Sequence, residues 1–403
     1  MKPQNFPLEE LFWFQEGPGV RKWQFMNSGV KLLNVGNIRS SGVLDLSRTE
    51  RCISHDEVAT RYKHFLVDEG DLVIASSGIS FDDDGMLRTR GAFVERAHLP
   101  LCLNTSTIRF KSKRGASIRY LRFWLDSHQF RLQITRLVTG SAQQNFGPSH
   151  LKDVIISLPD FPKQQRIVRL LEHADELRRT RRFALEMSES FLPAAFLTTF
   201  GDLEKNPHCW PERELGELCA EVLDCPHSTP IYSAIRTPHP CIRSSDIQAG
   251  YLDFSESKYV EPSVFQNRIA RGRPMPGDVI YCREGARFGN AARVLGNTEM
   301  CLGQRTMLFR ANRNVAAGEF IWAFLSSRGG YRQATRALDG SASPHVNVGE
   351  IVAFRVPIPP LPLQQKFATV VERVDRLRLM HRESLRQAEH LFASLLKRAF
   401  SLV

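Results

Sequence analysis

Apolar residues recur at helical spacing in two long stretches, residues 163–192 and 363–396. The first stretch carries them at Ile167, Leu170, Ala174, Leu177 and Phe191. The second carries them at Phe367, Val370, Val374, Leu377, Ala388, Leu391 and Leu395. This heptad-like spacing predicts two long helices, each with an apolar seam. Proline is tolerated in a first turn, as at Pro162 and Pro362, whereas Pro193 is expected to end or kink the first helix.

The two predicted helices have two alternative arrangements. Each helix can lie on its own domain, or the two can pack on each other as an antiparallel, coiled-coil-like pair. Their length and their repetition favour the antiparallel pair.

The rest of the chain alternates short β-rich runs with polar turns. Four runs bounded by Gly, Asp, Asn and Ser predict strands at residues 71–75, 107–111, 278–282 and 306–310. Apolar and aromatic residues at helical spacing predict helices at residues 117–137 and 319–338. Short strands with appended helices indicate an α+β fold.

The second half of the chain repeats the first. Residues 159–165 (PDFPKQQ) return as residues 359–365 (PPLPLQQ), displaced by 200 positions. Upstream, Gly70 and Asp71 before a β-rich run are matched by Gly277 and Asp278. Each half therefore consists of a globular module followed by a helix. We expect two pseudo-repeated mixed α/β domains and two helical spacers, at residues 1–158, 159–200, 201–356 and 357–403.

Composition narrows the class of protein. Of the 403 residues, 42% are hydrophobic and 24% are charged, which is ordinary for a soluble globular chain. No apolar run reaches the length of about 18 residues that a membrane span needs, and the first ten residues lack the apolar core of a signal peptide. We therefore expect a cytoplasmic protein without a membrane partner. The net charge of +11 favours a polyanionic partner.

The sequence contains no recognisable catalytic, cofactor or metal motif. It has no Asn-Pro-Pro-Tyr or Asp-Pro-Pro-Tyr segment, no glycine-rich nucleotide loop and no P-loop. The eight cysteines include no C-x-x-C pair, and the His and Cys residues between 208 and 241 lack the paired spacing of zinc ligands. We expect no catalytic residues, no metal and no cofactor in this chain.

Basic and amide residues supply candidates for DNA contacts. Lysines and arginines that follow matching strands suit phosphate contacts; these are Lys111, Lys113, Arg114, Arg310 and Arg313. Two matching polar loops suit base or backbone contacts through Gln143, Gln144, Asn145, His345 and Asn347. Arg283, Arg287 and Arg305 are candidates for bidentate contacts to guanine. The alternatives are polar turns without contacts, for the loops, and surface ion pairs, for the arginines.

Taken together, the duplicated order resembles the specificity subunit of type I restriction–modification systems, with two target-recognition domains separated by similar helical regions. Residues 356–366 (VPIPPLPLQQK) look like the entry into that family's helical region. Residues 13–19 (WFQEGPG) and 224–230 (DCPHSTP) resemble openings of its recognition domains. The second opening adds His227, Ser228 and Thr229 to the candidates for DNA contacts.

The resemblance implies a subunit without catalytic activity that reads a bipartite, asymmetric target in double-stranded DNA. Two methylation subunits, which would bind S-adenosylmethionine, would dock on the helical regions, and restriction subunits would join through them. The paired helices would act as a ruler between the half-sites. One helix of about 30 residues is about 45 Å long, the length of roughly 13 base pairs.

Two other functions stay open. One is the recognition subunit of a related enzyme whose methylase and nuclease are fused in one partner chain. The other is a basic scaffold that binds acidic protein surfaces. Steep loss of duplex binding with added salt would favour the DNA-binding functions.

Overall fold

The computed structural model describes residues 4–39, 41–78, 80–81, 86–113, 115–138, 145–248, 250–338 and 344–401. The chain divides into two compact units. Unit 1 contains Met1–Phe183 and Glu383–Val403, and unit 2 contains Ala184–Arg382. Each long helix therefore contributes to both units.

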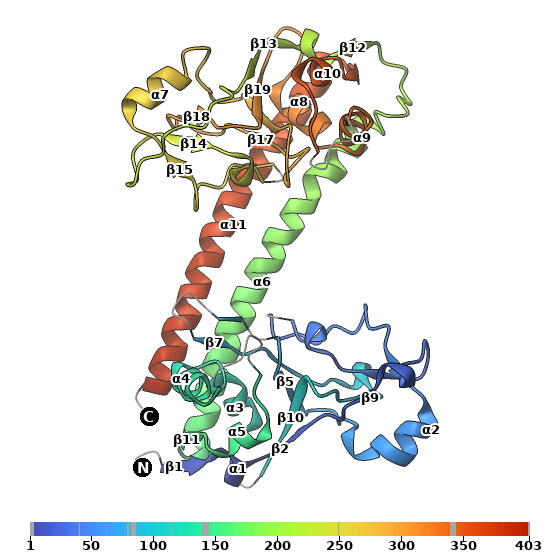
Figure 1. Ribbon diagram of the computed structural model, residues 1–403, viewed down its shortest axis with the longest axis vertical. Coiled ribbons are helices and arrows are strands. Elements are labelled where there is room, and N and C mark those ends of the chain that lie inside the picture. The colour runs from blue at the N-terminus through green and yellow to red at the C-terminus, as the bar shows by residue number, and fades with distance from the viewer. Residues whose placement is uncertain are drawn as a thin grey trace. The chain divides into compact units, whose positions relative to one another are not determined.

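Unit 1 is built on a four-stranded antiparallel sheet in the order β2-β10-β5-β8 (Figure 1). Its strands are β2 Phe12–Glu16, β10 Thr107–Ser112, β5 Leu72–Ala75 and β8 Gly91–Phe93. A smaller sheet, with β3 parallel to β9, contains β4 Cys52–Ile53, β3 Val30–Leu32 and β9 Leu101–Cys102. Two strand pairs complete the unit: β1 Gln4–Pro7 with β11 Ile155–Leu158, and β6 Ser80–Phe81 with β7 Leu87–Arg88.

Unit 2 repeats this topology. The four-stranded sheet has the order β13-β19-β16-β17, with β13 Cys219–Asp224, β19 Thr306–Ala311, β16 Val279–Cys282 and β17 Ala291–Arg293. The smaller sheet contains β15 Lys258–Tyr259, β14 Pro240–Ile242 and β18 Cys301–Leu302, again with one parallel pair. The strands β12 Glu212–Glu214 and β20 Arg355–Pro357 correspond to β1 and β11. The α+β duplication predicted from the sequence is confirmed, and the four predicted strands are β5, β10, β16 and β19.

Short helices surround the sheets. In unit 1 they are α1 Leu8–Leu11, α2 His55–Glu57, α3 Ile118–Trp124, α4 His128–Leu137 and α5 Pro148–Lys152. In unit 2 they are α7 Pro262–Arg268, α8 Gly318–Leu325, α9 Arg328–Arg336 and α10 Val348–Val352. The shorter turns are η1 Lys22–Gln24, η2 Val35–Asn37, η3 Val58–Tyr62, η4 Lys63–Phe65, η5 Arg96–His98, η6 Leu215–Leu218 and η7 Ser244–Asp246.

The single helices predicted at 117–137 and 319–338 are wrong, because each is two helices. Ser127 accepts a hydrogen bond from the backbone N–H of Phe130 at the start of α4. Ser327 accepts the equivalent bond from Gly330 at the start of α9. A serine in this capping position satisfies an N–H that has no helical partner, and it therefore begins a new helix.

The first long helix, α6 Phe161–Phe200, runs through Pro193. Of the two outcomes expected at Pro193, an end or a kink, the end of the helix is therefore wrong. Proline has no N–H for the carbonyl four residues earlier, which here belongs to Glu189. Arg378 of α11 (Leu361–Ser401) donates to that carbonyl at 3.1 Å and to the Ser188 carbonyl at 2.9 Å. An external donor thus compensates for the missing helical bond.

The segments of α6 and α11 pack antiparallel within each unit, as predicted. In unit 1 the Arg182 guanidinium is 2.8 Å from the Glu389 carboxylate, and Arg178 lies over the Phe392 ring. In unit 2 the Phe367 ring contacts the Phe196 ring, with centroids 5.6 Å apart.

The predicted seam is only partly correct. Ala174, Phe367, Val374 and Ala388 are buried, and Ile167, Val370 and Leu395 are partly buried. Five predicted seam residues are at least 38% exposed: Leu170, Leu177, Phe191, Leu377 and Leu391. Neighbouring residues are buried instead, namely Val168, Leu171, Leu192, Val371 and Phe392. The helices pack against their units as well as each other, and this second contact shifts the buried face.

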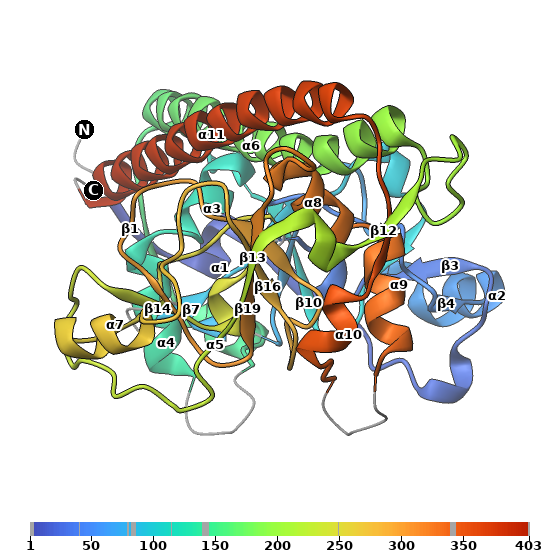
Figure 2. The same ribbon diagram turned by 90° about the horizontal axis from the view of Figure 1, so that it is seen from above.

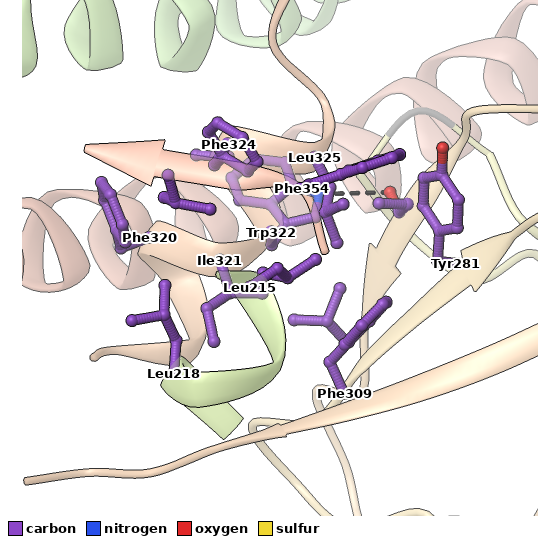
Figure 3. Close-up of a cluster of buried hydrophobic side chains, with 14 of the residues drawn as sticks. Leu215, Leu218, Tyr281, Phe309, Phe320, Ile321, Trp322, Phe324, Leu325 and Phe354 are labelled. Atoms are coloured by element: carbon purple, nitrogen blue, oxygen red, sulfur yellow. Dashed lines mark hydrogen bonds between the residues drawn. The ribbon is translucent and has the colours of Figure 1, made fainter. Parts of the chain in front are cut away.

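The core of unit 2 joins the sheet to the helices through aromatic side chains (Figure 3). Helix α8 lies between the sheet and the segments of α6 and α11 (Figure 2). Trp322 of α8 donates from Nε1 to the Ala291 carbonyl at 3.1 Å, which satisfies its one polar group in the core. No helix in the described ranges is long and apolar enough to cross a membrane.

Candidate nucleic-acid interface

Polar side chains from three strands lie together at one end of the large sheet of unit 2, where β13 and β16 end and β19 begins. Met307 and Thr306, at the start of β19, pair with Asp224 and Cys282, at the ends of β13 and β16. Arg283 and Arg305 lie next to these strand ends, where the Arg283 N–H donates to the Arg305 carbonyl at 3.1 Å. We call the surface at this end of the strands the end surface of unit 2. Loops at sheet ends commonly carry binding residues on a rigid scaffold.

Asp224 organises one side of this end surface. Its Oδ1 lies 3.3 Å from Nε of Arg283, and its Oδ2 lies 3.1 Å from Nε2 of His227. Gln304 donates to the His227 carbonyl at 2.6 Å. The contacts connect the loop that follows β13 to the loop that precedes β19.

Glu284 organises the other side. Its carboxylate lies 3.3 Å from Nε of Arg305 and 3.4 Å from Nδ1 of His345. The other ring nitrogen of His345 is 3.3 Å from Oδ1 of Asn347. The predicted residues Arg283, Arg305, His345 and Asn347 therefore lie together.

These arginines differ in access to solvent. The Arg283 side chain is 6% exposed, whereas the Arg305 side chain is 53% exposed and Arg287 is also exposed. Arg305 has a backbone φ of +69°, which a residue with a Cβ rarely adopts. Such backbone strain often occurs at functional positions. Ser228 and Thr229 are exposed in the same region, and the Ser228 carbonyl accepts from Arg268 at 3.1 Å.

The equivalent end surface of unit 1 carries different groups. Glu16 ends β2, Ser76 follows β5 and Ser106 precedes β10. Asn145 is exposed, and the adjacent Phe146 donates its N–H to the Ser76 carbonyl at 3.0 Å. The Val346 N–H makes the matching bond to the Arg283 carbonyl in unit 2, at 3.2 Å. Burial raises the pKa of the Glu16 carboxyl.

An arginine-lined groove of about 520 Å³ opens beside the end surface of unit 1. Its walls include Asn34, Arg39, Arg48, Arg51 and Ser106. Arg39 is paired with Asp45 at 2.7 Å, whereas Arg48 is exposed and makes no ion pair among the described residues. These arginines were not predicted as DNA contacts, because none of them follows a strand predicted from the sequence.

Two residues predicted to contact phosphates, one in each unit, lie at the other end of the strands, away from the end surfaces. Lys111 forms ion pairs with Asp68 and Asp71 of unit 1. Arg310 pairs equivalently with Asp278 at 2.9 Å, and this hydrogen-bonded contact raises the pKa of Arg310. Both basic groups thus neutralise the buried aspartate of a Gly-Asp turn, which favours a structural role.

The other predicted contacts are dispersed. Lys113 donates to the Glu9 carbonyl at 2.5 Å. Arg313 is exposed in unit 2, at the end of the strands away from the end surface. Arg114, Gln143 and Gln144 lie outside the described residues. Glu284 was not predicted, although its position directly after Arg283 was a usable signal.

The long helices expose large apolar side chains. Besides the five exposed seam residues, these are Phe161, Phe183, Met187, Leu197, Leu379 and Met380. In unit 2 a groove of about 450 Å³ is lined by Leu192, Pro193, Phe196, Leu197 and Trp322, among others. Exposed apolar patches of this kind occur at contacts with other proteins, in ligand-binding grooves and on membrane-binding surfaces.

The described ranges contain no group of three or more His, Cys, Asp and Glu residues that could hold a metal ion. The eight cysteines are all free thiols, and Cys209 is exposed.

The model of the type I restriction modification DNA specificity domain matches residues 3–186 and 253–390. The chain belongs to this family. The two matched segments lie mainly in the first and the second repeat, and together they cover most of the sequence. The family supplies the DNA-recognition component of its systems, which is distinct from the catalytic ones.

A curated relative from Methanocaldococcus jannaschii, a putative type I restriction enzyme MjaX specificity subunit, is 24% identical over 181 residues. The match covers 42% of this chain and 40% of the relative, so it spans less than half of either protein. The crystal structure of a type I restriction–modification S subunit from M. genitalium is similar in fold, with a TM-score of 0.57 and 15% identity. That similarity covers 99% of this chain and 96% of the other.

Proposed function

We propose that this chain is the specificity subunit of a type I restriction–modification complex and recognises an asymmetric, two-part target in double-stranded DNA. The observation that carries the proposal is the pair of end surfaces. One sheet topology occurs twice, with Asp224, Arg283 and Arg305 in unit 2 where unit 1 has Glu16, Ser76 and Ser106. Different polar groups on one repeated scaffold suit two different half-sites.

The side chains of the end surfaces would divide the recognition of each half-site. Exposed arginines such as Arg305 and Arg287 suit bidentate contacts to guanine, and Asn145 suits adenine. The arginines of the groove in unit 1 suit phosphates. We propose modules at residues 1–158 and 201–356 as the two recognition domains.

The helical segments at residues 159–200 and 357–403 would hold the partners. Two methylation subunits, which bind S-adenosylmethionine, would cover the exposed apolar residues of α6 and α11, and restriction subunits would join through them. Residues such as Leu170, Phe191 and Leu391 fit this role because they are 44–50% exposed on helices. The chain itself would carry out no chemistry, and the complex would act in the cytoplasm.

The decisive test is a genome-wide map of adenine methylation with and without this gene. We expect deletion to remove one motif with two unequal halves, and complementation to restore it. An unchanged map in a strain with active methylation would exclude the proposed function. A basic protein scaffold would also leave the map unchanged, and a fused methylase–nuclease partner would be identified by purification of the complex.

The proposed ruler has its own test. Inserting seven residues into α6 and seven into α11, near residues 183 and 383, adds about 10 Å to each helix. The methylated motif should keep both half-sites and gain roughly three base pairs of spacer. A change in half-site sequence at constant spacing would contradict the ruler.

A further inference from the structure

Among the described residues, the most exposed large apolar side chain of each unit lies in the same connection of the fold. Trp23 is 76% exposed in the loop between β2 and β3. Ile231 and Ile235 are 81% and 72% exposed in the loop between β13 and β14. Each loop starts at the end surface of its unit. The position recurs although the loop sequences differ.

Contacts of the two residues that follow Trp23 hold its side chain in solvent. The buried Gln24 accepts from the Arg21 N–H at 2.9 Å and donates to Glu57 at 2.9 Å and to Tyr62 at 3.0 Å. Phe25 packs against a buried cluster of unit 1. With Gln24 and Phe25 anchored inward, the turn directs Trp23 outward.

Unit 2 uses different bonds for the same result. Pro230 is buried and Tyr232 packs against a buried cluster, on either side of Ile231. The Ser233 N–H donates to the Tyr259 carbonyl at 2.8 Å, and the Ile235 N–H donates to Oγ of Ser233 at 3.2 Å. These isoleucines are therefore presented by an ordered loop.

The charges within both loops suit a polyanion, although the carboxylates of Glu57 and Glu299 lie beside them. Residues 17–29 and residues 225–239 contain no Asp or Glu, whereas Arg21, Lys22 and Arg236 are basic. The Arg51 guanidinium lies 5.1 Å from the Phe25 ring centroid and also lines the arginine groove. Charge complementarity and continuity with the end surfaces point to DNA rather than to another protein.

We propose that Trp23, Ile231 and Ile235 are apolar wedges that insert against the bases of the two half-sites when the complex binds DNA. The inference rests on the proposed function. It adds uncharged residues to those that would contact the DNA. Apolar side chains that enter a groove unstack or cover base steps, and an aromatic ring stacks on a base. Binding to DNA would then bury these side chains, which are exposed to solvent in the free protein.

The test uses the complete methylation complex and a duplex that contains its methylated motif. Trp23→Ala should weaken duplex binding roughly ten- to hundredfold, and Trp23→Phe should recover most of the loss. Because no phosphate contact is removed, the dependence of affinity on salt should keep its slope. Arg21→Ala, by contrast, should lower that slope by about one if Arg21 contacts a phosphate.

Unit 2 offers a matched control. Ile231→Ala and Ile235→Ala should weaken binding. Leu295→Ala should not, because Leu295, although 53% exposed, lies near the end of the same sheet that is away from the end surface. In a duplex with 2-aminopurine in one half-site, binding should raise fluorescence by unstacking. Trp23→Ala should abolish the rise in one half-site only, and Ile231→Ala in the other.

Three outcomes are distinguishable. If wild-type and wedge variants bind the duplex equally well, within twofold, the wedge proposal is overturned and the proposed function stands. If the variants lose the methylation subunits before DNA is added, the loops are protein contacts and the wedge proposal is again overturned. If the wild-type complex does not bind the duplex at all, the proposed function itself fails.

Discussion

Unit 1 and unit 2 share one sheet topology and the same buried polar contacts, but the side chains at the equivalent ends of their sheets differ. At the end surfaces, Ser106 of unit 1 takes the place of Arg305 in unit 2. In the interior, Gln164 and Gln364 make the same hydrogen bonds in both units. The contrast separates residues that build the scaffold from residues that are free to change the target.

The largest expected effect concerns Arg305. Arg305→Ala should weaken binding of the complex to its full target by about 1–3 kcal/mol, roughly 5- to 150-fold, because an exposed bidentate donor is lost. Binding should tolerate base changes in the unit 2 half-site and no others. Affinities for duplexes with single base-pair substitutions measure both effects.

Arg313→Ala is the matched control for Arg305→Ala, because both arginines are exposed and lie at opposite ends of β19. It should leave base preference unchanged. Equal relaxation of both half-sites by Arg305→Ala would mean that the two end surfaces do not read separate parts of the target.

The scaffold side of the comparison predicts equal effects in both units. Gln164 accepts from the Ser117 N–H at 2.9 Å, and Gln364 accepts from the Ala317 N–H at 3.1 Å, with both side chains almost completely buried. Replacing either by leucine leaves buried backbone groups unpaired, so each variant should lose about 2 kcal/mol of unfolding free energy.

Denaturant unfolding followed by circular dichroism measures the losses at the two glutamines. Gln165→Leu and Gln365→Leu, at the neighbouring exposed helix positions, should change stability by less than about 0.5 kcal/mol. Strongly unequal losses for Gln164 and Gln364 would show that the two units do not share this scaffold device.

The sequence was informative where local rules decide the structure. The strands β5 and β16 followed from Gly70 and Gly277, whose positive φ angles allow the tight turns before them. The breaks before α4 and α9 were also within reach of the sequence, since Ser127 and Ser327 are good capping residues.

Tertiary packing decided what the sequence could not. The exposure of Leu170 and Phe191 depends on which surfaces each long helix meets, and helical periodicity does not contain that information. Lys111 and Arg310 looked like DNA contacts because their aspartate partners are more than 30 residues away in sequence. The end surface of unit 2 was predicted in part, because Arg283, Arg305 and His345 were named without Glu284, the residue that connects two of them.

The smallest expected effect is that of replacing Glu16, the carboxylate that ends β2. Burial raises the pKa of Glu16, so the folded state holds that proton more tightly than the unfolded chain. Ionisation therefore costs stability as the pH rises from the ordinary value of 4.5 to the raised value. Glu16→Gln should match the wild type at pH 4 and become slightly more stable than it at pH 7.

Asp224→Asn should behave in the opposite way at pH 7. It removes the carboxylate that lies 3.3 Å from the buried Arg283 guanidinium, so it should destabilise the protein by about 2 kcal/mol. Unfolding of both variants at pH 4 and pH 7 measures the contrast. If Glu16→Gln destabilised the protein at pH 7 as Asp224→Asn should, Glu16 would have a cationic partner, and the two end surfaces would be electrostatically more alike than their side chains indicate.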